Sequence, residues 1–270
     1  MQKLFWLPVV ALLLLFSCQK EEVNAFNEKK LDILPFNSKN VFDQAGVIHN
    51  AILYKVIDNK KNLISLDDYV DYSHYVLKNN FNIEIQNSQN STNYSTNAIS
   101  SDVQLILDDA VNNYFNVVDR SSHSEIVKIK LKEFINLLLT YEHDVSVDYD
   151  FIYGEILEFE NQILTDSNMI QNDKDEIMQI TSIGRFSAFM WYNEYQKSLI
   201  SGNLNFNGGI STERSWWKWL SVAVADVAGG IAGAVIGSPT GIGAIAGSVG
   251  GAVSTSAGAP SLVDWISPDN

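Results

Sequence analysis

The chain of 270 residues contains a single cysteine, Cys18, and this scarcity limits its chemistry. One cysteine excludes a disulfide within the chain and a metal site built from several thiolates. Basic residues are also scarce, because 18 lysines and arginines face 32 aspartates and glutamates, which gives a formal net charge of −14. Binding to nucleic acid needs clustered basic side chains that neutralise phosphates, so this charge balance predicts no nucleic-acid partner.

Recognisable catalytic motifs are missing as well. The sequence has no HExxH metal-ligand pair, no GxSxG nucleophile turn, no P-loop and no convincing carboxylate pair. The glycines of residues 241–246 fit a dinucleotide-binding fingerprint by spacing, but that motif needs a preceding strand and a following strand–helix–strand unit. The sequence therefore predicts no catalytic residue, no cofactor and no metal ion. We expect a protein that is not an enzyme, and an enzyme whose site is assembled from distant residues is kept as an alternative.

The histidines are the other candidates for metal binding, and the sequence has four of them: His49, His74, His123 and His143. No two of them form a pair at helical spacing. Asp71 shares a helix face with His74, and residues 142–144 read Glu-His-Asp. Either group could bind a metal ion. The simpler interpretation, which we adopt, is that these histidines pack at helix surfaces or cap helix ends.

Residues 1–17 are typical of a secretion signal, with Lys3 at the basic end and an apolar run over residues 4–16. The run ends in LFSC at residues 15–18, which resembles the lipobox of bacterial lipoproteins with a bulkier Phe16 than usual. This resemblance implies that Cys18 is lipidated and begins the mature protein, so that the membrane is a partner through its acyl chains. An ordinary cleaved signal with an incidental cysteine is the alternative.

The residues after Cys18 read QKEE and resemble the surface-export signal of Bacteroidota lipoproteins. The resemblance implies an outer-membrane lipoprotein exposed at the cell surface. Residues 21–40 are polar and contain Pro35, which is typical of an extended linker. The sequence therefore predicts a lipidated tether over residues 18–40.

Apolar residues recur at every third or fourth position through most of residues 41–200, which is the spacing of amphipathic helices. The pattern predicts helices that begin at Asp43, at a capping box over 65–68, near Asp102, at Ser122 with Glu125, at Tyr149 and near Asp173. The predicted fold class is all-α, with a multi-helix domain over 41–200 and a linker over 201–212.

The most unusual stretch is residues 213–259, because no charged residue occurs from Val227 to Val263. Glycines recur every four positions on both sides of a break at Ser238-Pro239: Gly229, Gly233 and Gly237 before it, and Gly243, Gly247 and Gly251 after it. A glycine inside a helix costs about 1 kcal/mol relative to alanine, so this pattern indicates close helix–helix packing. The sequence predicts an antiparallel glycine-zipper helical hairpin over 213–259, followed by a tail over 260–270.

The hairpin also carries features of a membrane-active segment. Four tryptophans gather at one of its ends and are typical of a membrane-interface belt, namely Trp216, Trp217, Trp219 and Trp265. The alternative is that these rings pack against the helical domain. Strongly apolar side chains of the first helix favour insertion by about 3 kcal/mol, and a central Asp226 opposes it by about 2.5–3.5 kcal/mol. Insertion of this helix is therefore close to balanced.

Two short segments resemble parts of an uncharacterised family of Bacteroidota secreted lipoproteins. Residues 42–50 (FDQAGVIHN) fit a D-x-x-G-x-x-H-N pattern, and residues 183–191 (IGRFSAFMW) fit a second segment of the same proteins, as does the glycine-rich C-terminus. The family implies no established activity. From the residues themselves, we expect Gly46, His49 and Asn50 to form a helix start whose polar pair is tied to another helix.

The glycine-zipper hairpin with terminal tryptophans resembles membrane-active segments of class II bacteriocins. We expect a surface lipoprotein whose helical domain has a structural or binding role, with its protein partner unknown. The alternative is a bacteriocin-like protein that acts on membranes through the hairpin. The two differ in packing, because a structural hairpin buries its large apolar residues against residues 41–200 and a membrane-active one leaves them exposed or loosely covered. The test residues are Val222, Ile231, Val235, Ile245 and Val249.

Overall fold

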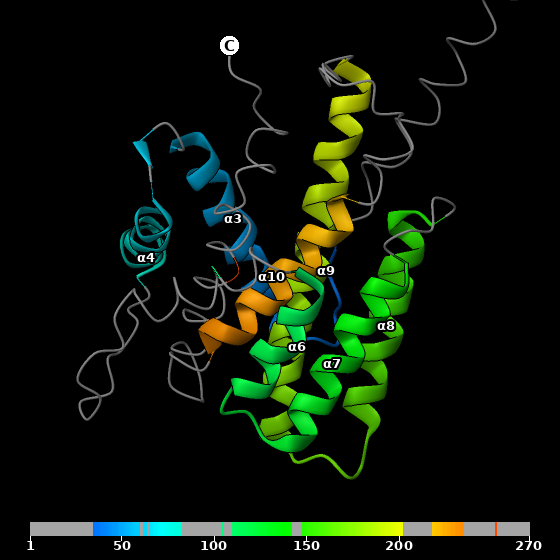
Figure 1. Ribbon diagram of the computed structural model, residues 1–270. Helices are drawn as coiled ribbons and strands as arrows, with labels where there is room; N and C mark the ends of the chain where they lie inside the picture. Colours follow the sequence, from blue (N-terminus) through cyan, green and yellow to red (C-terminus); the bar gives the residue numbers. More distant parts are fainter. Residues whose placement is uncertain are drawn as a thin grey trace, which may run out of the picture. The chain divides into compact units, whose positions relative to one another are not determined.

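The computed structural model describes residues 35–59, 62–63, 65–82, 104, 110–141, 147–201, 218–234 and 252. Within these residues the fold is all-α and contains no strand, which confirms the predicted fold class. The helices are α3 (Asp43–Asn59), α4 (Leu66–Phe81), α6 (Ala110–Arg120), α7 (Glu125–Thr140), α8 (Tyr149–Thr165), α9 (Gln171–Ser201) and α10 (Lys218–Ala234) (Figure 1).

Local sequence determines where two of these helices begin. The Ser65 hydroxyl accepts a hydrogen bond from the Asp68 backbone N–H, and the Asp68 carboxylate accepts one from the Ser65 N–H at 2.7 Å, so the predicted capping box is confirmed. Helix α7 begins two residues later than predicted, because Ser124 and not Ser122 is its N-cap. The Ser124 hydroxyl accepts from the backbone N–H of Val127 at 3.3 Å.

Helix α9 (yellow in Figure 1) is the central element, because it contacts α3, α7, α8 and α10. Every residue from Ile177 to Ala188 is buried. A helix surrounded in this way has no solvent face, so the polar residues of this stretch are buried too: Gln179, Thr181, Ser182, Arg185 and Ser187. These side chains must find their hydrogen-bond partners on neighbouring elements, because water does not reach them.

Helix α10 is the first helix of the predicted hairpin, and it packs against α9, α7 and α6. All residues from Val222 to Gly233 are buried, and Val222 and Ile231 are only 1% and 0% exposed. In the part of the chain that the structure describes, no helix is long and apolar enough to cross a membrane. Val235 of the first predicted hairpin helix and Ile245 and Val249 of the second lie outside the described residues.

Residues 35–42, which we call the strap, precede α3 and pack on α8 and α9. Asn40 is only 4% exposed, and its Nδ2 donates to Glu160 of α8 and to the backbone oxygen of Met178, both at 2.9 Å. The hydroxyl of Tyr153 donates to the backbone oxygen of Phe36 at 2.7 Å. The sequence placed residues 35–40 in the tether, but their polar groups satisfy buried partners on two helices and hold them in the packed domain.

Three glycines differ in the space around them. A Cβ atom added at Gly46 of α3 would lie 2.8 Å from Phe186 Cβ, and one at Gly184 of α9 would lie 2.7 Å from Val227 Cγ2. A Cβ at Gly154 of α8 would meet nothing within 4 Å. Gly46 and Gly184 therefore permit close approach of α3 and α10 to α9, and Gly154 has no such role.

We predict that Gly46→Ala and Gly184→Ala each lower the free energy of unfolding by about 1–3 kcal/mol, because the added methyl group overpacks a helix interface. Gly154→Ala is the matched control, and it should raise this free energy by about 0.5–1 kcal/mol through helix propensity alone. Urea denaturation followed by circular dichroism measures all three. A stabilising effect at every position would contradict the described packing.

Candidate functional site

Two buried polar clusters lie on different faces of α9. We call them the Arg185 cluster and the Asp226 cluster after their central residues. Both central side chains are 0% exposed, as are Glu160 and His49 beside them. Charged side chains are almost never buried so completely without partners. The partners therefore determine how these clusters act.

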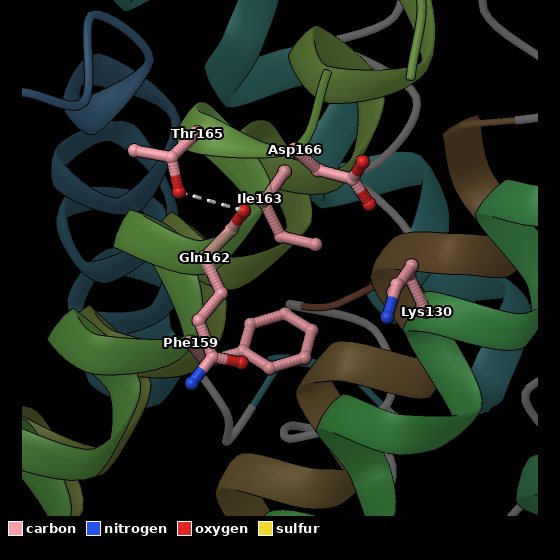
Figure 2. A pocket seen from close by; sticks show the side chains of 6 residues that line it. All are labelled: Lys130, Phe159, Gln162, Ile163, Thr165 and Asp166. Atoms are coloured by element: carbon pink, nitrogen blue, oxygen red, sulfur yellow. Dashed lines mark hydrogen bonds between the residues drawn. The ribbon is translucent and has the colours of Figure 1, made fainter. Parts of the chain in front are cut away.

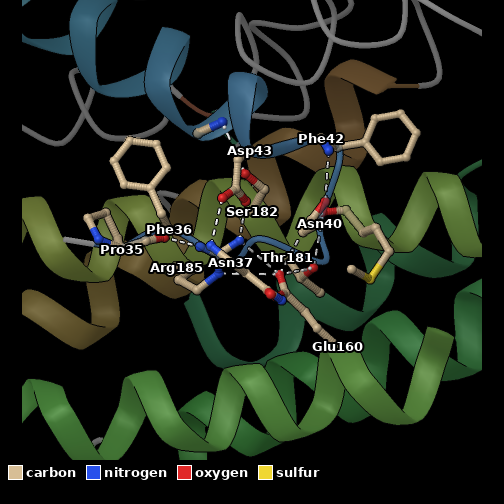
Figure 3. Close-up of polar contacts among 12 residues, drawn as sticks. Pro35, Phe36, Asn37, Asn40, Phe42, Asp43, Glu160, Thr181, Ser182 and Arg185 are labelled. Carbon is tan, nitrogen blue, oxygen red and sulfur yellow. Dashed lines mark hydrogen bonds and ion pairs between the residues drawn. The ribbon is translucent and has the colours of Figure 1, made fainter. Parts of the chain in front are cut away.

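Arg185 projects from α9 towards the strap, the start of α3 and α8 (Figure 3). Its guanidinium donates to the backbone oxygen of Pro35 and to the carboxylate of Asp43, the first residue of α3. Its Nη2 also donates to Glu160 Oε1 at 3.3 Å. One buried cation therefore joins three elements to α9, in the fork geometry for which the planar guanidinium is suited.

Glu160 is the anionic centre of the same cluster. Its Oε1 accepts from Asn40 Nδ2 and Thr181 Oγ1, both at 2.9 Å, and from Arg185. Its Oε2 accepts from Asn37 Nδ2 at 2.6 Å. These donors come from the strap and α9, so the carboxylate on α8 is satisfied without water. The Arg185 cluster is thus a closed network of protein groups.

Asp226 is the only acidic residue of α10 and the centre of the second cluster. Its Oδ2 accepts from the Ser187 hydroxyl and from Trp191 Nε1, both on α9, the latter at 3.4 Å. His49 Nε2 of α3 lies 3.3 Å from the same oxygen, within ion-pair distance. That nitrogen has no partner of hydrogen-bond geometry, so the contact is electrostatic. The Asp226 cluster therefore joins α3, α9 and α10.

The other side of the His49 ring extends this connection. His49 Nδ1 lies 2.8 Å from Asn50 Oδ1, and Asn50 Nδ2 donates to the backbone oxygen of Phe186 at 2.9 Å. Both ring nitrogens of His49 therefore face side-chain oxygen atoms, Nδ1 that of Asn50 and Nε2 that of Asp226. The expected polar pair at the start of α3 is tied to another helix, as predicted.

Ser187, His49 and Asp226 are the residue types of a catalytic triad, but their connections differ from those of a triad. In a triad the serine hydroxyl bonds to the histidine, whereas Ser187 donates to the carboxylate of Asp226. All three residues are also 0% exposed. A nucleophile needs access to its substrate, and the buried Ser187 has none in this arrangement. The cluster is built to hold helices together.

The two clusters unite the two short segments singled out in the sequence, residues 42–50 and residues 183–191. Asp43 of the first segment pairs with Arg185 of the second, and Gly46 packs against Phe186. Asp226 joins them from the glycine-rich segment. Sequence reasoning identified the segments but missed their convergence, as well as the part played by Glu160 and the strap. An arginine within an otherwise uncharged stretch of α9, residues 177–193, was the available signal.

The predicted hairpin residues fall only partly within the described structure. Gly229 and Gly233 lie in α10 and are buried, and Trp219 lies in the first turn of this helix. The remaining predicted residues lie outside the described residues: Cys18, Trp216, Trp217, Gly237, Gly243, Gly247, Gly251 and Trp265. The glycine-zipper pairing and the tryptophan belt therefore stay predictions.

The remaining histidines make separate local contacts. His123 Nδ1 lies 2.7 Å from Glu176 Oε2, which joins the start of α7 to α9. His74 lies in α4 and is partly buried, and His143 lies outside the described residues. Across the described helices and the strap, no group of three or more histidine, cysteine, aspartate or glutamate side chains is placed to hold a metal ion.

A hollow of about 350 Å³ lies between α7 and the C-terminal end of α8 (Figure 2). It is lined by Lys130, Phe159, Gln162, Ile163, Thr165 and Asp166. Lys130 Nζ already pairs with Glu133 at 2.7 Å, and Asp166 Oδ1 accepts from the backbone N–H of Asn168 at 2.8 Å. Gln162 and Thr165 likewise donate within α8. The polar groups on its wall are thus engaged within the chain.

No protein-family model, no curated protein and no solved structure matches this chain. Functional inference therefore rests on the geometry of the two clusters, the burial of α10 and the sequence of the N-terminus.

Replacing Asp226 with alanine would remove the acceptor shared by Ser187, Trp191 and His49 in an interior without water. We predict that Asp226→Ala lowers the free energy of unfolding by about 3–5 kcal/mol, because breaking a buried pair leaves polar groups uncompensated. Glu133→Ala breaks an exposed ion pair with Lys130 and serves as control, with an expected change below about 0.5 kcal/mol. Similar effects of the two substitutions in urea denaturation would refute the role given to Asp226.

Burial lowers the pKa of His74 below its ordinary value of 6.5, and the nearby Asp71 carboxylate opposes this effect. The unfolded chain then binds the proton more readily than the folded protein does. The free energy of unfolding therefore falls as the pH drops through the pKa of His74 in the unfolded chain towards its lower pKa in the folded protein. We predict that His74→Asn weakens the loss of stability between about pH 7.5 and about pH 5. Urea midpoints at both pH values measure this, and an unchanged pH dependence would exclude His74 as its source.

Proposed function

We propose that the protein is an outer-membrane lipoprotein, displayed at the cell surface through lipidated Cys18, whose helical domain has a structural or binding role. The N-terminal signal and the lipobox-like residues 15–18 support the anchor. The continuous burial of α10 from Val222 to Gly233 is the observation that carries the structural role of the hairpin. A helix with this environment acts as part of a protein core.

Energetic considerations favour α10 in the bundle over α10 in a membrane. Release would expose the apolar surfaces that α10 shares with α9, α7 and α6, and each large apolar side chain buried there contributes about 1.5–3 kcal/mol. Asp226 would lose Ser187, Trp191 and His49 and would oppose entry into hydrocarbon by about 2.5–3.5 kcal/mol. Both effects retain α10 in the bundle.

The bacteriocin-like alternative draws its support from sequence alone, namely the uncharged glycine-rich stretch and its flanking tryptophans. It requires α10 to leave its partners on α3 and α9. The enzyme alternative requires an accessible reactive group, and the buried Ser187 and His49 do not supply one. Neither alternative gains a specific observation comparable with the burial of α10.

The experiment compares the intact protein with Cys18→Ser in cell fractions and on purified vesicles. We predict that the wild-type protein carries acyl chains by mass spectrometry and stays in the membrane fraction, because each buried methylene contributes about 0.8 kcal/mol. Purified Cys18→Ser protein should neither bind nor permeabilise dye-filled vesicles of neutral or anionic lipid. Wild-type protein without acyl chains would overturn the anchor. Vesicle leakage by Cys18→Ser would overturn the structural role of the hairpin and favour the bacteriocin-like alternative.

A further inference from the structure

The strap is held to the bundle mainly by polar contacts. Pro35 accepts from Arg185, Asn37 Nδ2 donates to Glu160 at 2.6 Å, and Lys39 Nζ donates to the side chain of Asn161 at 3.2 Å. Asn40 adds its bonds to Glu160 and to the Met178 backbone. Nearly every residue that contacts the bundle does so through a hydrogen bond.

Apolar burial contributes less to the same attachment, although Pro35 is buried and Phe42 is partly buried. Val41 is 83% exposed and Phe36 is 50% exposed, although the Phe36 ring contacts the Phe186 ring edge-on at 5.2 Å between centroids. Ser38 and Lys39 are exposed as well. The adjoining α3 differs sharply, because it buries Ile48, Ile52, Leu53 and Val56. Helix α3 is therefore fixed largely by the hydrophobic effect, whereas the strap is fixed mainly by hydrogen bonds.

This difference separates the strap energetically from the helices. When a segment held by hydrogen bonds separates from the bundle, water replaces most of its hydrogen bonds, so the net loss of free energy is small. When an apolar helix lifts away, water cannot replace its contacts. Segments with few buried apolar contacts open locally at a lower free energy than the core. Arg185 and Glu160 would be hydrated in the open state and would keep their mutual ion pair.

We propose that the strap (residues 35–42) acts as a clasp, which means that it opens as a unit while α3, α8, α9 and α10 stay folded. Opening uncovers Arg185 and Glu160, the two groups that are otherwise 0% exposed. Asp43 marks the hinge, since it belongs to α3 and bonds both to Arg185 and to the backbone N–H of Asn37. The Arg185 cluster thus has a closed, dry state and an open, hydrated state.

The clasp lies between the tether and the bundle along the chain. If the proposed anchor at Cys18 is correct, tension on the anchored chain reaches Pro35 before any of the described helices. The opening itself rests only on the contacts of the strap and does not require lipidation. Its test can therefore use unlipidated Cys18→Ser protein, so that a failure of the clasp and a failure of the membrane anchor are separate results.

Native-state hydrogen exchange by NMR tests the clasp on two backbone amides of the strap. The Asn37 N–H donates to Asp43 Oδ2 at 2.7 Å, and the Asn40 N–H donates to the Asn37 oxygen at 2.8 Å. Both amides should exchange faster than the core amides of α9 between Ile177 and Ala188. Low concentrations of urea should raise their exchange rates only slightly, because the opening exposes little surface.

The variant for this test is Asn40→Ala, which removes the side-chain bonds to Glu160 and Met178. Exchange at the Asn37 amide should rise about tenfold, with a much smaller change across α9. Val41→Ala alters an exposed neighbour and should leave both rates unchanged. Exchange of the Asn37 and Asn40 amides at the rate and urea dependence of α9 would overturn the clasp. Equal acceleration of the strap and α9 by Asn40→Ala would overturn it as well.

Discussion

The burial of Arg185 and Asp226 at the interfaces of α9 is the constraint on which the rest of the structure depends. Arg185 and Asp226 have no access to water, so each must be satisfied by groups from other elements. Arg185 recruits the strap, α3 and α8, and Asp226 recruits α3 from the other side. Helix α3 takes part in both clusters, through Asp43 and His49. The polar groups therefore tie the strap, α3, α8 and α10 to α9.

Apolar packing and polar contacts have different roles in this arrangement. Helix α10 consists mostly of small apolar residues, which can pack against a neighbour in more than one register. A single buried carboxylate with partners on α3 and α9 favours one register over the others, the best-supported role of buried polar groups. Gly46 and Gly184 then allow the backbones to approach closely. Packing supplies most of the stability, and Asp226 supplies specificity. This division also explains why a glycine-rich segment serves as a core helix.

Local sequence patterns were sufficient to predict the fold class. The two buried clusters depend on contacts between residues far apart in the sequence, and no sequence pattern indicated those contacts. Helical spacing and the Ser65 capping box depend on residues a few positions apart, so they could be predicted. Asn40 belongs to a polar stretch typical of a tether, and its partner Glu160 lies 120 residues away, which periodicity cannot reveal. In the sequence, Arg185 attracted attention only as part of residues 183–191. The burial of its helix on every side depends on tertiary packing. The sequence could therefore point to some residues of the clusters but could not predict which residues contact one another.

The link between His49 and Asp226 tests the account most directly, because it joins residues 42–50 to the glycine-rich segment. A double-mutant cycle with His49→Gln, Asp226→Asn and the combined variant, in urea denaturation, isolates their coupling free energy. The account predicts a favourable coupling of at least about 0.5 kcal/mol, as found for residues in one buried network. Additive effects of the two substitutions, with a coupling indistinguishable from zero, would contradict it.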